Sequence, residues 1–361
     1  MNEYLAWLDR ETQGVWWHDS AIPEEIDEAL ASGAKGVTLN PVLVYKALTD
    51  RRDYWRPILV DIPAGLEKKD KVNAIISRVT MHTAARFERI FEESQGKWGY
   101  VCAQVDPRRS SDRTYMLEMA KMFSGWAKNV AVKLPITAAG LDVLEECVAL
   151  GIPVVGTVSF TLSQIIQIEK RYQAGLIRGE KEGVKAAPCI AVVMVGRIDD
   201  YMRDVITDAG RYDVHESDII QIGSAIMKRA LSIWKQNEYK SILMPAGMRG
   251  GYHAQALSGA PMAFSIHPKI QKQLKTIPKP YTTEIDIHID QDTLARLCKV
   301  DEFMRAYEPD GMIPEEFIRF GVVQKTLAQF TESWNGIENY IIKEAAHESV
   351  DSRILWKNNY S

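Results

Sequence analysis

Short β-branched runs alternate with amphipathic helical stretches along most of this chain, and this alternation constrains the fold more than any other feature. Eight runs have the length and composition of buried strands, and most are followed by Pro, Gly, Ser or Thr. In chain order they are Val15–Asp19, Gly36–Leu39, Tyr100–Val105, Val130–Leu134, Val154–Thr157, Ile190–Met194, Ser241–Ala246 and Ala263–Ile266. Eight such strands separated by helices predict an α/β fold, namely a closed (β/α)8 TIM barrel.

The stretches between the runs carry apolar residues at the i, i+3 and i+4 spacing of helices that pack on a sheet. We predict helices over Glu24–Ala31, Lys71–Glu93, Ser110–Met122, Ala138–Leu150, Leu162–Ala174 and Asp218–Gln236. An open, doubly wound sheet is the alternative for such a pattern. The sequence contains no GxGxxG or GxxxxGK[ST] loop that would favour it.

The alternation ends near Pro278–Pro280, so we expect a barrel domain over residues 1–280 and a C-terminal helical segment, residues 281–361, packed on it. The predicted helices of this segment are Gln291–Lys299, Glu302–Arg305 and Ile313–Lys343, with a polar tail after about Glu344. The last helix carries an apolar stripe of Phe317, Phe320, Val323, Leu327 and Phe330. Packing of this stripe on the barrel is favoured over binding to a partner.

Composition and charge exclude several classes of protein. The 361 residues carry 44 Lys+Arg and 48 Asp+Glu, and no long basic run is present, which argues against a nucleic-acid partner. Four widely spaced cysteines have no metal-ligand spacing and are expected to be buried or free thiols. An acidic N-terminus and the lack of a long apolar run predict a cytoplasmic protein that does not bind membranes. We expect a homo-oligomer, built through the outer barrel helices or the C-terminal segment.

The strand Val130–Leu134 holds the first candidate for chemistry. Period-2 alternation turns Ala131 and Lys133 toward the barrel interior, and barrel active sites lie at the C-terminal ends of strands. Buried lysines are rarely left unpaired. Because burial disfavours the ammonium form, a buried lysine can act as a neutral amine that attacks a carbonyl carbon. A structural ion pair is the alternative interpretation of Lys133.

Other predicted strands also end on inward polar residues. These are Asp19, Thr38 with Asn40, Gln104 and Thr157. Each alone is more often a helix cap or a turn former than a catalytic residue. Together with Lys133 they give five strand ends suited to carbonyl chemistry, which predicts one shared active site.

Several segments resemble the transaldolase family, which includes the fructose 6-phosphate aldolases. They are Gly36–Pro41 (GVTLNP), Val132–Thr137 (VKLPIT), Gly151–Thr157 (GIPVVGT), Val195–Asp199 (VGRID) and Met244–Arg249 (MPAGMR). The lysine segment is the most specific, and the likeness extends over about residues 13–340. The resemblance implies a (β/α)8 barrel without a metal or other cofactor, acting on a small-molecule sugar or sugar phosphate.

The resemblance also implies catalytic roles. Lys133 would form an imine with a ketose, and Asp19 would exchange a proton with the hydroxyl on the fourth carbon. Gln104 and Thr157 would hold the water that shuttles protons during imine formation. The resulting activity would be transfer of a dihydroxyacetone unit to an aldehyde acceptor, as in the pentose phosphate pathway, or plain aldol cleavage.

The substrate-binding positions follow in the same way. Thr38 and Asn40 are the candidates for contacts with substrate hydroxyls, while Arg197 and Arg249 would hold a phosphate. Four positions depart from the family pattern and concern mainly the water and the substrate's tail. They are Gln104 in place of a glutamate, Met194 in place of an aromatic residue, Gly247 in place of a serine, and Val192 in place of a small or hydroxylated residue.

Alternatives from other classes stay open at this point. A fructose 6-phosphate aldolase-like lyase is supported by Gln104, and a catalytically inactive barrel acting as a binding subunit is a second alternative. A metal-dependent barrel aldolase is disfavoured, because the Asp286, His288 and Asp290 cluster is expected on an exposed segment with no second cluster. We expect His253 in a surface loop.

Overall fold

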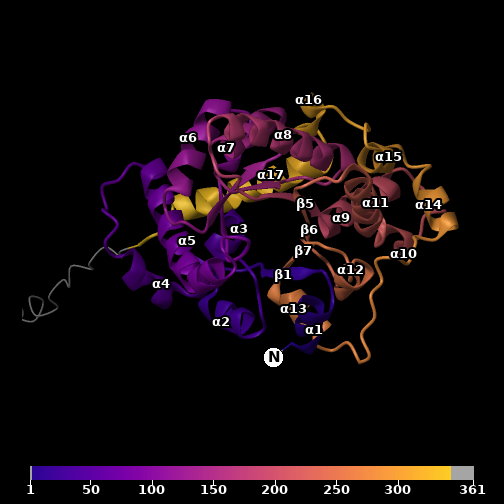
Figure 1. Cartoon of the computed structure of the whole chain (residues 1–361), viewed down its shortest axis with the longest axis horizontal. Coiled ribbons are helices and arrows are strands. Elements are labelled where there is room, and N and C mark those ends of the chain that lie inside the picture. The colour runs from indigo at the N-terminus through magenta and orange to yellow at the C-terminus, as the bar shows by residue number, and fades with distance from the viewer. Residues whose placement is uncertain (1, 343–361) are drawn as a thin grey trace, which may run out of the picture.

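Seven parallel strands form the centre of the molecule in this computed structural model, which describes residues 2–342 (Figure 1). Their bounds are β1 Val15–His18, β2 Val101–Gln104, β3 Val130–Pro135, β4 Val154–Thr157, β5 Cys189–Met194, β6 Ile242–Ala246 and β7 Ala263–Ile266. Strands β2 to β6 pair in sequence order, and β1 pairs with β7. All of these pairings are parallel, as the strand–helix alternation predicts.

The predicted strand Gly36–Leu39 fills the eighth position as a single bridge rather than as a full strand. Val37 bridges His18 on β1 and Val101 on β2, and its N–H donates to the carbonyl of Tyr100 at 2.9 Å. The extended run is short because Asn40 already caps the next helix. Since β6 also contacts β7, the ring is complete. The predicted (β/α)8 TIM barrel is confirmed, with Val37 standing for its second strand.

Helices surround the ring and mostly begin directly after a strand. Their bounds are α1 Glu3–Glu11, α2 Pro23–Ala31, α3 Pro41–Asp50, α4 Arg52–Leu59, α5 Lys68–Glu93, η1 Pro107–Arg109, α6 Arg113–Ser124, α7 Ala138–Ala149, α8 Leu162–Lys181, α9 Val195–Asp208, α10 Glu216–Ile219, α11 Ile222–Asn237, α12 Gly251–Ala256 and α13 Pro268–Leu274. Polar caps fix several of the starts: the side chains of Asn40, Asp112, Thr137 and Thr161 accept a backbone N–H from α3, α6, α7 and α8.

The structure differs from the predicted helices in three places within the barrel. The predicted helix Leu162–Ala174 extends to Lys181. The predicted helix Asp218–Gln236 is two helices, α10 and α11. The predicted helix Ser110–Met122 begins later, at Arg113, after the short turn η1. Helix α9 was not predicted, although it follows β5 directly and carries the charged residues Arg197, Asp199 and Asp200.

The C-terminal segment contains α14 Gln291–Leu297, α15 Asp301–Tyr307, α16 Pro314–Phe317 and α17 Gly321–Glu338. The prediction of one helix over Ile313–Lys343 is wrong, because the chain leaves the helical conformation at Phe320 (φ −65°, ψ 130°). Gly321 then passes so close to Tyr201 that an added Cβ would lie 2.5 Å from the phenol oxygen. The predicted tail after about Glu344 lies outside the described residues.

Helix α17 connects distant parts of the barrel. It packs against α3, α5 and α9, and Figure 1 shows it in yellow running between these groups of helices. All five residues of the predicted apolar stripe are buried, with Phe317 on α16, Phe320 as the N-cap of α17 and the other three on α17, which agrees with packing on the barrel. Over residues 2–342, no helix is both long and apolar enough to cross a lipid bilayer.

Candidate active site

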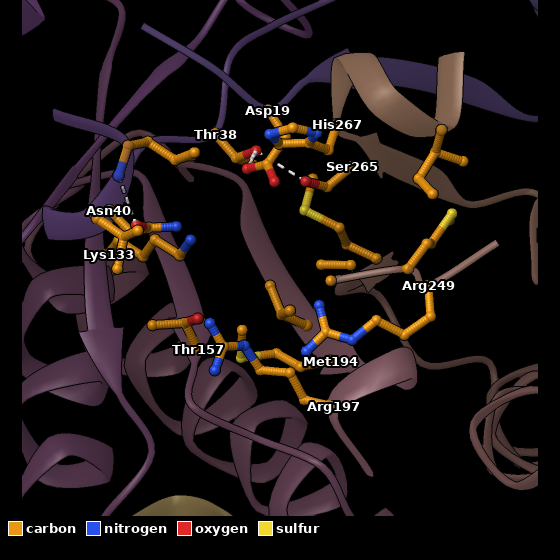
Figure 2. A pocket seen from close by; sticks show the side chains of 18 of the residues that line it. Asp19, Thr38, Asn40, Lys133, Thr157, Met194, Arg197, Arg249, Ser265 and His267 are labelled. Carbon is orange, nitrogen blue, oxygen red and sulfur yellow. Dashed lines mark hydrogen bonds between the residues drawn. The ribbon is translucent and has the colours of Figure 1, made fainter. Parts of the chain in front are cut away.

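A cavity of 290 Å³ opens where the strands end, and it collects most of the predicted site residues (Figure 2). Seven of the eight line it, namely Asp19, Thr38, Asn40, Lys133, Thr157, Arg197 and Arg249. The eighth, Gln104, lies outside it. These side chains come from six barrel positions and surround one space: β1, the Val37 bridge, β3, β4, the start of α9 after β5, and the loop after β6.

Lys133 lies on β3 with only 5% of its surface exposed. Its Nζ is 3.4 Å from the carbonyl oxygen of Leu39, and among residues 2–342 it pairs with no carboxylate. The structural ion pair considered for this lysine is therefore absent from the described residues. A primary amine that is buried, aimed into a cavity and not neutralised by a carboxylate is placed to react with a carbonyl group.

Asp19 directly follows β1 and is held by a short chain of hydroxyl groups. The Thr38 hydroxyl donates to Asp19 Oδ1 at 2.6 Å, and the Ser265 and Thr38 hydroxyl oxygens are 2.7 Å apart. Because the Thr38 proton is used toward the carboxylate, Ser265 is the donor to Thr38. This arrangement fixes one carboxylate oxygen and leaves Oδ2 to accept a proton from a bound hydroxyl group.

Thr157 and Gln104 are both buried, and in the described part of the chain their side-chain polar atoms have no hydrogen-bond partner. The Thr157 hydroxyl and both amide atoms of Gln104 make no hydrogen bond within the described residues. Thr157 faces the cavity, whereas Gln104, opposite Lys133 across the β2–β3 ladder, lines a separate small space beside Asn40. The two side chains predicted to share one water therefore face different spaces.

The backbone after Thr157 is strained. Val158 has a φ of +53°, a region that a β-branched residue rarely adopts and that costs on the order of 1–3 kcal/mol. Gln164 stabilises this turn by donating from Nε2 to the Val158 carbonyl at 3.2 Å. The turn directs the chain away from β4 while the Thr157 hydroxyl stays in the cavity.

Asn40 has two functions in this arrangement. Its Oδ1 accepts the backbone N–H of Leu43 at 3.1 Å and so caps α3. The Nδ2 group is the part of the amide that can donate to a ligand in the cavity.

The opposite side of the cavity is built from two arginines. Figure 2 shows the guanidinium groups of Arg197 and Arg249 pointing into the cavity, across from Asp19 and Lys133. Asp200 binds Arg249, with 2.6 Å between Oδ2 and Nε, while Arg197 lies 5.5 Å from the ring centre of Phe330 on α17. Burial and the neighbouring charge of Arg249 lower the pKa of Arg197 to about 10. Two cations this close are expected to attract an anion.

A glycine allows the two arginines to approach each other. A Cβ on Gly196 would lie 2.5 Å from the Gly247 carbonyl oxygen and 2.6 Å from Cγ of Arg249. The start of α9 therefore packs directly on the loop after β6 because residue 196 has no side chain. Gly247, in that loop, has a φ of +62°, which glycine adopts at little cost.

The remaining lining residues give the cavity a positive and partly apolar character. Lys269 adds to the charges of Arg197 and Arg249, Lys46 is paired with Asp50, and Asp19 is the carboxylate among the lining residues. One wall is apolar and consists of Val192, Met194, Met244, Ala246 and Met248. The cavity thus combines a reactive amine, a carboxylate and a surplus of cationic groups, which suits a carbonyl compound that carries an anionic group.

Sequence reasoning missed several residues of this site. Ser265 on β7 lines the cavity, and the same period-2 alternation would have turned Ala263 and Ser265 inward. Asp200 could have been found only from its partner, because an aspartate early in a helix is common. The expectation for His253 was wrong: it is fully buried on α12, 2.7 Å from Asp199.

The Asp286, His288 and Asp290 cluster lies on an irregular segment, and all three residues are exposed. Among residues 2–342, no group of three or more His, Cys, Asp and Glu side chains is arranged to hold a metal ion.

Comparison with known proteins identifies the class of protein. The model of the Transaldolase/Fructose-6-phosphate aldolase family matches residues 16–341. The chain belongs to this family.

Individual relatives are more distant. The chain is 29% identical over 184 residues to Transaldolase 1 of Streptomyces avermitilis, covering 49% of this chain and 48% of that protein. It is 26% identical over 216 residues to a transaldolase of Neisseria meningitidis, covering 59% of each. It is 30% identical over 168 residues to a transaldolase of Kocuria rhizophila, covering 45% of this chain and 46% of that protein. The matched regions therefore span about half the length of these curated relatives.

Proposed function

We propose that this protein is a transaldolase-type Schiff-base enzyme that transfers a dihydroxyacetone unit from a ketose phosphate to an aldehyde. The observation that carries the proposal is the position of Lys133. It is buried, has no carboxylate partner within residues 2–342, and lies in one cavity with Asp19 and a pair of arginines. Family membership and relatives that are named transaldolase support the same activity.

The first half of the reaction uses Lys133 and Asp19. The Nζ amine adds to the second carbon of the ketose and water leaves, which gives an imine. The Asp19 carboxylate takes the proton of the hydroxyl on the fourth carbon, and the bond between the third and fourth carbons breaks. Its electron pair moves toward the imine nitrogen and leaves an enamine on Lys133, while the remainder of the substrate departs as an aldehyde.

The second half reverses these steps with a different partner. The enamine adds to the acceptor aldehyde, Asp19 returns the proton to the new hydroxyl group, and water hydrolyses the imine to release the product and the free amine. Thr38 and Ser265 keep Asp19 in one orientation during both proton transfers. Thr157 and Asn40 offer polar groups to the water and the substrate hydroxyls. We propose that Gln104, which lies opposite Lys133 on the neighbouring strand β2, helps to hold the Lys133 side chain in place.

The two arginines would bind the phosphate of the substrate. Guanidinium groups form paired hydrogen bonds with phosphate oxygens, and an anion between Arg197 and Arg249 would offset their mutual repulsion. We further propose a cytoplasmic place in sugar-phosphate metabolism of the pentose phosphate type, a homo-oligomeric state, and no nucleic-acid partner, in keeping with the balanced charge of the chain.

The decisive experiment is reduction with borohydride in the presence of dihydroxyacetone or fructose 6-phosphate, followed by peptide mass spectrometry. We expect one adduct, on Lys133, that is absent from Lys133→Ala. Lys228→Ala is the matched control, because Lys228 is a half-buried lysine on α11, away from the cavity, and burial lowers its pKa. This variant should keep the adduct on Lys133. An adduct on another lysine, or none, would overturn the mechanism.

Two further measurements separate the alternatives. Turnover that requires an acceptor aldehyde indicates a transferase, whereas release of free dihydroxyacetone without an acceptor indicates the aldolase-like lyase that Gln104 favours by resemblance. Loss of activity on adding a chelator, together with no borohydride adduct, would instead indicate a metal-dependent aldolase. Adduct formation without turnover of any ketose would indicate an inactive barrel that binds its ligand.

A further inference from the structure

A buried acid and histidine pair lies directly behind the two arginines. Asp199 is on α9, two residues after Arg197, and His253 is on α12, four residues after Arg249. Their side chains are 1% and 0% exposed, and His253 Nε2 is 2.7 Å from Asp199 Oδ2. Neither side chain lines the cavity, so neither can contact a ligand there.

We propose that Asp199 and His253 are positioning residues that fix the backbone of Arg249, and thereby the place of its guanidinium group in the anion site. The inference rests on the proposed function, since it assigns a role within the same site. It concerns a residue pair that touches the anion only through Arg249.

The directions of the hydrogen bonds support this role. The backbone N–H of Arg249 donates to His253 Nδ1 at 3.4 Å, so Nδ1 is the nitrogen without a proton. The ring proton is then on Nε2 and is donated to Asp199. The second carboxylate oxygen of Asp199 accepts the backbone N–H of Gly223 at 2.8 Å. Asp199 therefore accepts from two donors, and it links α9, α11 and α12 behind the cavity.

The neighbouring aspartate holds the other end of the same arginine. Asp200 binds Nε of the Arg249 side chain at 2.6 Å, while Asp199 holds the Arg249 backbone through His253. Two adjacent residues of α9 thus hold the backbone and the guanidinium group of Arg249 in place, and the same helix supplies Arg197. Two guanidinium groups repel each other, so contacts of this kind are needed to keep Arg249 beside Arg197 when no anion is bound.

The hydrogen bonds of this pair require a carboxylate at position 199. An asparagine at position 199 has the shape of aspartate but only one acceptor oxygen. It can satisfy Gly223 or His253 but not both. If its amide group faces the histidine, the ring proton moves to Nδ1 and then opposes the N–H of Arg249. In the other orientation the amide group opposes the N–H of Gly223 and shifts α9 against α11. Asp199→Asn should therefore disturb the position of Arg249 relative to α9 in either orientation, without creating a cavity.

The test compares a phosphorylated ketose with its unphosphorylated counterpart in steady-state kinetics. For Asp199→Asn we expect KM for the phosphorylated ketose to rise about tenfold or more, with kcat changed less than about threefold. The value of kcat/KM for the unphosphorylated ketose should stay as in the wild type. His253→Gln should produce the same split between the two substrates.

Asp218→Asn is the matched control. Asp218 is equally buried on α10. It accepts hydrogen bonds from Arg296 and Thr293 and has no link to the loop after β6 that carries Arg249. If Asp199→Asn and Asp218→Asn lose similar stability and neither changes KM, the pair is only structural and the proposal is wrong. If the wild type does not prefer the phosphorylated ketose, the assignment of the two arginines as an anion site is wrong. That outcome tests the proposed function and not the hydrogen bonds of Asp199 and His253.

A second measurement tests that geometry on the wild-type protein. Long-range ¹H–¹⁵N NMR correlations show which ring nitrogen of a histidine carries the proton, and comparison with His253→Gln assigns the signals. We expect a neutral His253 with its proton on Nε2 at pH 7. A proton on Nδ1, or on both nitrogens, would overturn the proposal even if the variants fail to fold.

Discussion

The two sides of the cavity are built in different ways. The side that carries Lys133, Asp19 and Thr157 is formed by strands and their first following residues, so the register of the barrel fixes it. The side that carries Arg197 and Arg249 is formed by α9 and the loop after β6, and Gly196 lets these two segments meet. Barrel register places the reacting groups, whereas contacts between loops and helices place the groups that select the substrate.

Burial differs most between two residues on the strand side and the ion pair on the other side, while Asp19 and Arg197 are both half-buried. Lys133 is 5% exposed and Thr157 is fully buried, whereas the side chains of Arg249 and Asp200 are 42% and 44% exposed. Electrostatic interactions are therefore stronger around the reacting groups than around the exposed ion pair. We expect substitutions on the two sides to differ in size and in kind.

The largest effect is expected for Asp19→Asn. The amide keeps the shape of the side chain but cannot take the proton of a substrate hydroxyl, and loss of a general base costs about 10²–10⁴-fold in kcat. KM should change little, and borohydride trapping on Lys133 should persist, because the imine can still form. Retention of wild-type kcat would show that the base is another group and would break the distinction between the two sides.

The next effect concerns the free energy of unfolding, which should depend on pH through the buried side chain of His18. This residue, on β1, precedes Asp19, and its Nδ1 accepts a hydrogen bond from Gln271 Nε2 at 3.0 Å. Burial lowers its pKa from 6.5 to about 3 in the folded protein. The stability tied to its neutral form is present above pH 6.5 and is lost as the pH falls from 6.5 toward 3. At pH 4 this amounts to about 3 kcal/mol relative to pH 7.

Urea unfolding at pH 7 and pH 4 measures this effect. His18→Gln should lose less unfolding free energy between the two pH values than the wild type, by about 3 kcal/mol. His288→Gln is the control, since His288 is exposed and should leave the difference unchanged. An equal pH dependence in the wild type and His18→Gln would contradict the buried, neutral state of His18.

The smallest effect is expected for Arg249→Ala. Loss of one charged hydrogen-bonding group to phosphate should lower kcat/KM for a phosphorylated ketose about 10–100-fold and change the unphosphorylated ketose much less. Arg203→Ala is the control, because Arg203 also binds Asp200 but does not line the cavity. If kcat/KM falls as much for the unphosphorylated ketose as for the phosphorylated ketose, Arg249 does not bind the anion.

The sequence predicted the strand side of the cavity well for a physical reason. Alternation along a strand determines which residues face inward, and it put Lys133, Thr38 and Thr157 into one space. It could not show that Asn40 would end the second strand by capping α3. It also could not show that Gln104 would face a different space from Thr157, because side-chain rotamers decide that.

The other side depended on contacts between segments far apart in the chain. The resemblance to known proteins supplied Arg197 and Arg249, but nothing local to either residue predicts the proximity of α9 to the loop after β6. His253 was expected in a surface loop, which is more common for such a histidine than a role as ligand or catalyst, and its partner Asp199 could not be found by spacing. The break before α17 was missed because residues 318–320 continue the apolar pattern of a helix while Gly321 packs on Tyr201.

The contact between Arg197 and Phe330 has a consequence for the synthesis of the protein. A ribosome releases the N-terminal part of a chain first. All seven strands, and with them Lys133 and Asp19, emerge before α17, the last helix of the described residues. The carbonyl-binding side can therefore assemble on the growing chain, whereas Arg197 obtains its aromatic neighbour only after α17 has also emerged.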